Sequence, residues 1–330
     1  MGDKTAIEWC DRTWNAWMGC QRTSEACRFC YAESWANRYG VVQWGATADR
    51  RRTAPTNWRK PAKWQATPWL ACRMCGWRGP ERDAGVCWTC PQCESTRYTE
   101  RTRQRIFVNS LSDFFEDRPE LTPWREEAIQ IMLDCDELDF LLLTKRPENI
   151  NRLLDDIIAS GSDAGIELEV AMLQNAGRLP ANWWVGTTVE NQHYAEKRIP
   201  ELLAVPAQTR FLSMEPLLGP VDLAPWLDEL MPGHTWRDCL CGRIDPADRP
   251  CVTCGAHGIH WVIVGGESSH YARPMDADWA RWIHAACLKA AVPFFFKQGS
   301  QANWERYKDY ESFPPDLQFR SFPQMQKAHA

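Results

Sequence analysis

The chain has 330 residues, a formal net charge of −5 and the apolar content of an ordinary globular protein. No apolar run approaches the roughly 18 residues that span a bilayer, and the acidic balance excludes a protein that binds polyanions through its overall charge. No N-terminal apolar run resembles a secretory signal, so we expect a cytoplasmic protein. In that reducing compartment, its 15 cysteines are expected to bind metal rather than form disulfides.

Three cysteines follow a strand predicted over residues 13–18. They are Cys20, Cys27 and Cys30. Three close thiolates can hold three irons of a [4Fe–4S] cluster and leave the fourth iron without a protein ligand. That open iron can bind a substrate or cofactor, so the triplet indicates chemistry. The alternative is a zinc site that Cys10 or a histidine completes.

Basic residues and tryptophans alternate in the next segment. The basic residues there are Arg50, Arg51, Arg52, Arg59, Lys60 and Lys63, beside Trp58 and Trp64, and Arg97, Arg101, Arg103 and Arg105 form a second group. Such a pattern can hold phosphates and stack bases. It is equally typical of solvated loops around a metal knuckle.

Residues 66–104 read as a zinc-ribbon-like insertion. They contain two Cys-x-x-Cys knuckles and one additional cysteine. Tetrahedral zinc requires four ligands from two such knuckles, so we expect Cys72, Cys75, Cys90 and Cys93 to bind it. Cys87 is then the spare cysteine.

Short apolar runs alternate with helical patterns along the rest of the chain. The predicted strands are 106–109, 140–143, 183–186, 210–212, 261–264 and 293–296. Helices are expected over 150–158, over 279–290 after Asp276 as N-cap, and from Thr122 with Pro123 in its first turn. Repeated βα units favour a parallel sheet, and seven candidate strands suit a partial or distorted (β/α) barrel.

Polar side chains follow most of these strands. They are Asn109, Ser110 and Asp113; Thr144, Lys145 and Arg146; Thr188, Glu190 and Asn191; Ser213 and Glu215; Glu267; and Lys297 and Gln298. The carboxyl ends of barrel strands build active sites, so these residues are expected to converge with the cysteine triplet at one mouth. For each residue taken alone, a position in an ordinary solvent-exposed loop explains the pattern equally well. Glu267 stands out because it follows Gly265 and Gly266, which permit close backbone approach.

A second cysteine-rich insertion is expected over 236–258. Its candidate zinc ligands are Cys239, Cys241, Cys251 and Cys254, with His257 and His260 as nearby substitutes.

The segment Cys27-Arg28-Phe29-Cys30 resembles half of the radical S-adenosylmethionine (SAM) signature, although six residues rather than three separate the first two cysteines. Several ordered motifs resemble a phage-associated three-cysteine family within that superfamily. They are Ile7-Glu8-Trp9, Thr13-Trp14-Asn15, Gly19-Cys20, Cys30-Tyr31-Ala32-Glu33, Leu143-Thr144-Lys145-Arg146-Pro147, Ser213-Met214-Glu215-Pro216-Leu217-Leu218-Gly219-Pro220, Val264-Gly265-Gly266-Glu267-Ser268 and Phe294-Phe295-Phe296-Lys297-Gln298. The resemblance implies one barrel domain over 1–330 that carries the two insertions.

The resemblance further implies that the open iron binds SAM and that the reduced cluster cleaves it, so that a hydrogen is abstracted from the substrate. An external donor such as flavodoxin or ferredoxin would supply the electron. The expected SAM-binding residues are Phe29, Asn109, Ser110, Lys145, Glu190, Glu215, Gly265, Gly266 and Glu267. Substrate binding is assigned to Arg146, Arg273 and Lys297.

The phage association and the basic segments together favour DNA, or a modified nucleobase, as the substrate. The hypothesis is a radical step in hypermodification or rearrangement of thymine in phage DNA, within the host cytoplasm. One alternative is a non-enzymatic zinc protein that binds nucleic acid or a protein partner. The other is a radical SAM enzyme that acts on a small metabolite or peptide.

Overall fold

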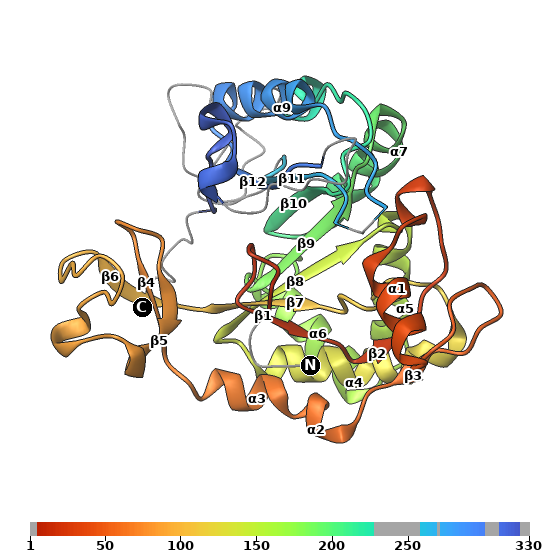
Figure 1. Ribbon diagram of the computed structural model, residues 1–330. Helices are drawn as coiled ribbons and strands as arrows, with labels where there is room; N and C mark the ends of the chain where they lie inside the picture. The colour runs from red at the N-terminus through yellow and green to blue at the C-terminus, as the bar shows by residue number, and fades with distance from the viewer. Residues whose placement is uncertain (1–4, 228–257, 269–270, 301–309, 324–330) are drawn as a thin grey trace.

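A seven-stranded parallel sheet forms the centre of the protein. The structure is a computed structural model that describes residues 5–227, 258–268, 271–300 and 310–323 (Figure 1). In spatial order the strands are β1 (Arg12–Trp14), β7 (Gln104–Val108), β8 (Leu138–Thr144), β9 (Trp183–Thr188), β10 (Thr209–Met214), β11 (Trp261–Gly265) and β12 (Phe294–Gln298). The sheet curls without closing, because β1 and β12 lie at opposite edges. The predicted partial α/β barrel is confirmed.

Helices connect successive strands and pack on the outer face of the sheet (Figure 1). They are α4 (Thr122–Asp134), α5 (Ile150–Ala159), α6 (Asp163–Gln174), α7 (Gln192–Leu203), the short α8 (Ala224–Leu227) and α9 (Ala277–Lys289). Three match predictions: α4 has Pro123 in its first turn, α5 covers 150–158, and Asp276 caps α9 by accepting from the Asp278 N–H. Within the described ranges, no helix has both the length and the apolarity needed to cross a membrane.

Side chains of the central strands alternate between two buried layers. Ile106 packs in the layer beneath the helices, whereas Phe107 lies in a separate aromatic cluster on the concave face. Trp9 from the N-terminal segment joins that inner cluster together with Trp184 and Trp261. Burial on both faces explains why the strands read as continuous apolar runs rather than as alternating ones.

Gly186 in β9 is required by the packing of the inner cluster. A Cβ atom at this position would lie 2.5 Å from the Phe211 ring of the neighbouring strand. A larger residue would therefore displace the aromatic side chains that fill the concave face.

The strand predicted over 13–18 is divided between two sheets. β1 ends at Trp14, and β2 (Trp17–Met18) pairs antiparallel with β3 (Arg51–Arg52). Asn15 and Asn109 cause the break: Asn15 Oδ1 accepts from the Leu111 N–H, and Asn109 Oδ1 accepts from the Ala16 N–H. The chain then continues through α1 (Tyr31–Tyr39), α2 (Pro55–Trp58) and α3 (Lys60–Gln65).

A small antiparallel sheet projects from the edge of the barrel (Figure 1). It consists of β5 (Arg78–Pro80), β4 (Trp69–Cys72) and β6 (Thr99–Thr102), in that spatial order, and we call it the ribbon. Arg78 joins it to the barrel through an ion pair of 2.8 Å with Asp11. In the second predicted insertion, all four candidate ligands lie outside the described residues.

Candidate functional site

A cavity of about 430 Å³ opens at the carboxyl ends of the parallel strands. All three cysteines of the triplet line it. So do most of the other predicted site residues, namely Phe29, Asn109, Ser110, Lys145, Arg146, Glu215, Gly266, Glu267 and Lys297. The sequence-based expectation that strand ends and triplet converge is therefore met at this cavity.

The triplet is held by a loop that leaves β2 through a strained turn. Gly19 has a φ of +101°, and a Cβ atom there would lie 3.0 Å from Val42 and 3.1 Å from Arg50, so only glycine fits. Cys27 ends a short 3₁₀ turn, and Cys30 is the N-cap residue of α1. One short loop thus presents all three sulfurs to the cavity.

The three thiols have different electrostatic surroundings. Burial raises the pKa of Cys20 to about 12, and nearby Asp113 adds to this effect while Arg146 opposes it. Burial also raises the pKa of Cys30. For Cys27, burial is outweighed by the Lys145 ammonium and by hydrogen bonds from Thr23 and Ser24, so its pKa is lowered. Lys145 therefore favours thiolate, the form that binds metals.

The spacing of the triplet argues against a single metal ion. Cys20, Cys27 and Cys30 do not all lie within 4.8 Å of one another, the separation that groups the ribbon cysteines. A cubane cluster takes one thiolate at each corner, so its ligands are farther apart than those of one ion. Cys10, the alternative fourth ligand, lies in the inner aromatic cluster and donates its S–H to the Ile7 carbonyl. Among the described residues, Cys10 and the triplet therefore do not form a compact four-ligand group like that of the ribbon.

Two acidic residues of the cavity are paired with basic ones. Glu215 lies 2.9 Å from Lys297 Nζ and accepts from Trp9 Nε1 at 3.1 Å. Glu267 pairs with Arg273 at 2.7 Å. Arg273 also packs over the Phe29 ring, 5.5 Å from its centroid, although it does not line the cavity itself.

The family model that matches the chain covers residues 4–325 and is described as protein of unknown function (DUF5131). The chain belongs to this family. No curated protein and no solved structure matches it.

Glu190 and Gly265, predicted to bind SAM, do not line the cavity in this DUF5131 protein. Glu190 is fully buried and pairs with Arg198 at 2.6 Å, so it stabilises the junction of β9 and α7. A Cβ at Gly265 would contact Glu215 at 3.0 Å, and one at Gly266 would lie 2.5 Å from Ser300 Oγ. Internal packing thus accounts for both glycines.

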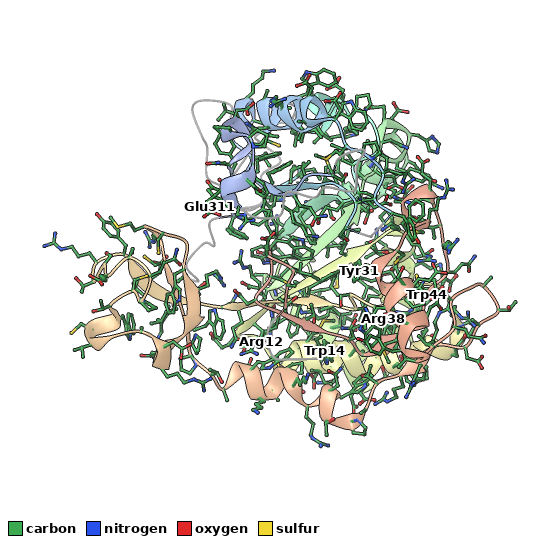
Figure 2. All side chains as sticks on the ribbon, viewed as in Figure 1. Arg12, Trp14, Tyr31, Arg38, Trp44 and Glu311 are labelled. Atoms are coloured by element: carbon green, nitrogen blue, oxygen red, sulfur yellow. The ribbon has the colours of Figure 1, made fainter. Side chains whose placement is uncertain are left out.

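Several residues that line the cavity were missed by reasoning from the sequence, among them Trp9 and Tyr31. Trp9 lines the cavity and holds Glu215, and Tyr31 lines it and donates to the Ser110 carbonyl at 2.7 Å. Figure 2 labels Tyr31 together with Trp44, a third lining residue. Tyr31 directly follows Cys30, and this adjacency was the available signal. For Trp9 the available signal was its place in the motif Ile7-Glu8-Trp9, although that motif gave it no particular role.

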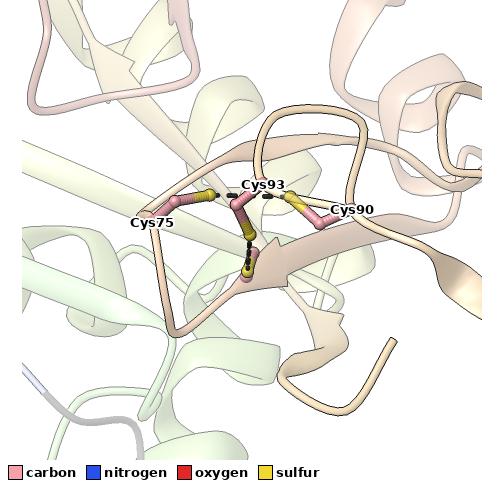
Figure 3. A group of neighbouring side chains, drawn as sticks. Cys75, Cys90 and Cys93 are labelled. Atoms are coloured by element: carbon pink, nitrogen blue, oxygen red, sulfur yellow. Dashed lines mark hydrogen bonds between the residues drawn. The ribbon is translucent and has the colours of Figure 1, made fainter. Parts of the chain in front are cut away.

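The ribbon contains a four-cysteine group that can hold a metal ion such as zinc. Its members are the four predicted ligands, Cys72, Cys75, Cys90 and Cys93. Their sulfurs all lie within 4.8 Å of one another (Figure 3). Backbone turns shape both knuckles, with hydrogen bonds from the Gly76 N–H to the Cys72 carbonyl and from the Glu94 N–H to the Cys90 carbonyl. Cys87 is exposed and outside the group, as expected.

Several arginines of the basic segments are paired with carboxylates of the same chain. Arg50 is buried against Glu116 at 2.7 Å. Further pairs are Arg52–Glu127, Arg101–Glu81, Arg103–Asp139 and Arg105–Asp11. These carboxylates offset much of the positive charge that the sequence pattern offers to a polyanion.

Proposed function

We propose that the protein is a radical SAM enzyme whose [4Fe–4S] cluster binds Cys20, Cys27 and Cys30. The observation that carries the proposal is the position of three cysteines from one loop in a charged cavity at the carboxyl-end mouth of a half-barrel. When bound, such a cluster supplies the electron for reductive cleavage of SAM and for the hydrogen abstraction that follows. The electron would come from an external donor such as flavodoxin or ferredoxin.

The remaining cavity residues supply groups suited to an amino acid and a nucleoside. Asn109 Nδ2 is buried and has no hydrogen-bond partner among the described residues, so it can donate to a ligand. Lys145 Nζ, which donates to Thr188 Oγ1 at 3.3 Å, can neutralise a carboxylate. Glu215 can accept from an ammonium group, and Tyr31 and Phe29 offer aromatic surface.

For the substrate we carry forward a DNA base, or a modified nucleobase, in phage thymine hypermodification within the host cytoplasm. Interleaved arginines and tryptophans support this proposal. A small metabolite or peptide is the second candidate, and the internally paired arginines favour it. We also propose zinc as the ion of the ribbon, because four thiolates from two knuckles are typical of structural zinc.

Anaerobic reconstitution of wild type and Cys27→Ala tests the proposal. We expect about four irons per chain at the triplet in the wild type and formation of 5′-deoxyadenosine from SAM after reduction with dithionite. Cys27→Ala should lose both. Cys87→Ala is the matched control, since this exposed cysteine lies outside both sites. Zinc alone, with no iron in the wild type, would reject the enzyme and favour a zinc protein that binds nucleic acid or a partner.

The substrate is tested separately. Binding of duplex DNA is measured across a salt titration. Nucleosides from the DNA of the phage that encodes the protein are compared by mass spectrometry with those of the same phage without the gene for this protein. A changed nucleoside supports the DNA-base proposal. Unchanged nucleosides and no DNA binding would leave the small-molecule candidate.

A further inference from the structure

Arg146 contacts the cysteine triplet directly. Its Nη1 donates to Cys20 Sγ at 3.8 Å, and its Nη2 donates to the Gln21 carbonyl at 2.9 Å. The side chain is only 10% exposed. Arg146 lines the cavity and also contacts the loop that carries the triplet, so its guanidinium lies directly beside the cysteines.

Asp113 fixes the orientation of this guanidinium. One carboxylate oxygen accepts from Arg146 Nη1 at 2.8 Å and from the Lys145 N–H at 3.1 Å. The other oxygen accepts from Thr144 Oγ1 at 2.6 Å and from the Phe115 N–H at 3.0 Å. Four donors from two strand ends hold the carboxylate, so Asp113 acts as a positioning residue for Arg146.

Hydrogen bonds to a cysteine sulfur withdraw electron density from an attached cluster and stabilise its reduced form. We propose that Arg146 raises the reduction potential of the cluster through its hydrogen bond to Cys20, an inference that rests on the proposed function. This role in tuning the cluster is additional to the predicted role of Arg146 in binding substrate.

Local geometry, rather than net charge, carries this effect. The positive charges of Arg146 and Arg50 face the negative charges of Asp113 and Glu116, with Arg50 bound to Glu116 through two contacts of 2.7 Å. The group is neutral as a whole. The directed N–H of Arg146 is what reaches the sulfur.

Redox titration followed by electron paramagnetic resonance tests the inference on anaerobically reconstituted protein. The variants are Arg146→Met, which removes the donor, and Arg146→Lys, which keeps a charged donor. Arg28→Met is the control: it removes one exposed arginine from the same loop, and no hydrogen bond from Arg28 to a cysteine sulfur is found among the described residues.

We expect the midpoint potential of Arg146→Met to move to more negative values while its iron content stays at the wild-type level. Arg146→Lys should recover part of the shift, and Arg28→Met should titrate like the wild type. An unchanged potential in Arg146→Met would overturn the inference, as would loss of iron in both Arg146 variants, which would assign the residue to loop assembly. Absence of any cluster in the wild type would reject the proposed function itself, so the two failures are distinguishable.

Discussion

The four cysteines of the ribbon and the three cysteines of the triplet differ in how closely their sulfurs are grouped. In the ribbon, four sulfurs converge within 4.8 Å and leave no ligand position open. In the triplet, three sulfurs from one loop are not grouped in this way and share a cavity with two lysines, one arginine and two glutamates. The comparison teaches that cysteines of one chain can form a compact four-sulfur group in one place and line an open cavity in another.

Loss of one ribbon ligand should have the largest effect. Cys90→Ser removes a fully buried ligand, and structural zinc supplies on the order of 10 kcal/mol of folding free energy in small zinc domains. We expect loss of one zinc per chain by elemental analysis and rapid proteolysis within residues 66–104. Iron bound at the triplet should be retained, with Cys87→Ser as the control. Loss of both metals together would break the comparison by showing that the sites depend on each other.

The junction between ribbon and barrel should respond to pH. Burial raises the pKa of Asp139 to about 7, although Arg103 3.9 Å away opposes the effect. In the unfolded chain, Asp139 has its ordinary pKa of about 4. The folded state holds the proton more tightly, so the contribution of Asp139 to the free energy of unfolding is present below about pH 4 and is lost as the pH rises to about 7.

Asp139→Asn removes this dependence. The wild type should lose up to about 3 kcal/mol of its free energy of unfolding between pH 5 and pH 8, at 1.36 kcal/mol per pKa unit. The variant should not show this loss, so the difference between the two proteins should change by that amount. Urea unfolding at the two pH values measures it. An equal difference between the two proteins at both pH values would contradict the raised pKa.

A smaller effect is expected at the open site. Glu215→Gln removes a charged acceptor that lines the cavity, so SAM should bind roughly 10- to 100-fold more weakly, as for loss of a hydrogen bond to a charged group. Isothermal titration calorimetry on reconstituted protein measures the affinity. Glu190→Gln is the matched control, because Glu190 lies outside the cavity; folded Glu190→Gln should bind SAM like the wild type. Equal weakening by both variants would contradict this division of roles.

The sequence predicted the elements that depend on local pattern. Apolar runs marked the buried strands, and two Cys-x-x-Cys knuckles identified the four ribbon cysteines, because knuckle geometry is set within a few residues. Asp276 was likewise found as a helix cap. The convergence of strand-end residues on one mouth followed from parallel strand topology alone.

The sequence could not separate residues with similar local settings and different tertiary partners. Glu190 and Glu215 both follow strands, but only Glu190 meets a buried arginine from the next helix. The Gly265-Gly266 pair resembled a ligand loop, whereas Ser300 and Glu215 explain it. Arg146 likewise donates hydrogen bonds to Cys20 and to Asp113. These residues are distant in the sequence, so local spacing does not reveal the contacts.

Aromatic side chains fill the concave face in the described part of the barrel, where Phe211 packs against Gly186. Trp9 and Phe107 belong to this aromatic cluster and also line the cavity, so the same side chains that fill the concave face form part of the cavity wall. A substitution that loosens the packing of the concave face is therefore expected to alter the shape of the cavity as well as the stability of the sheet.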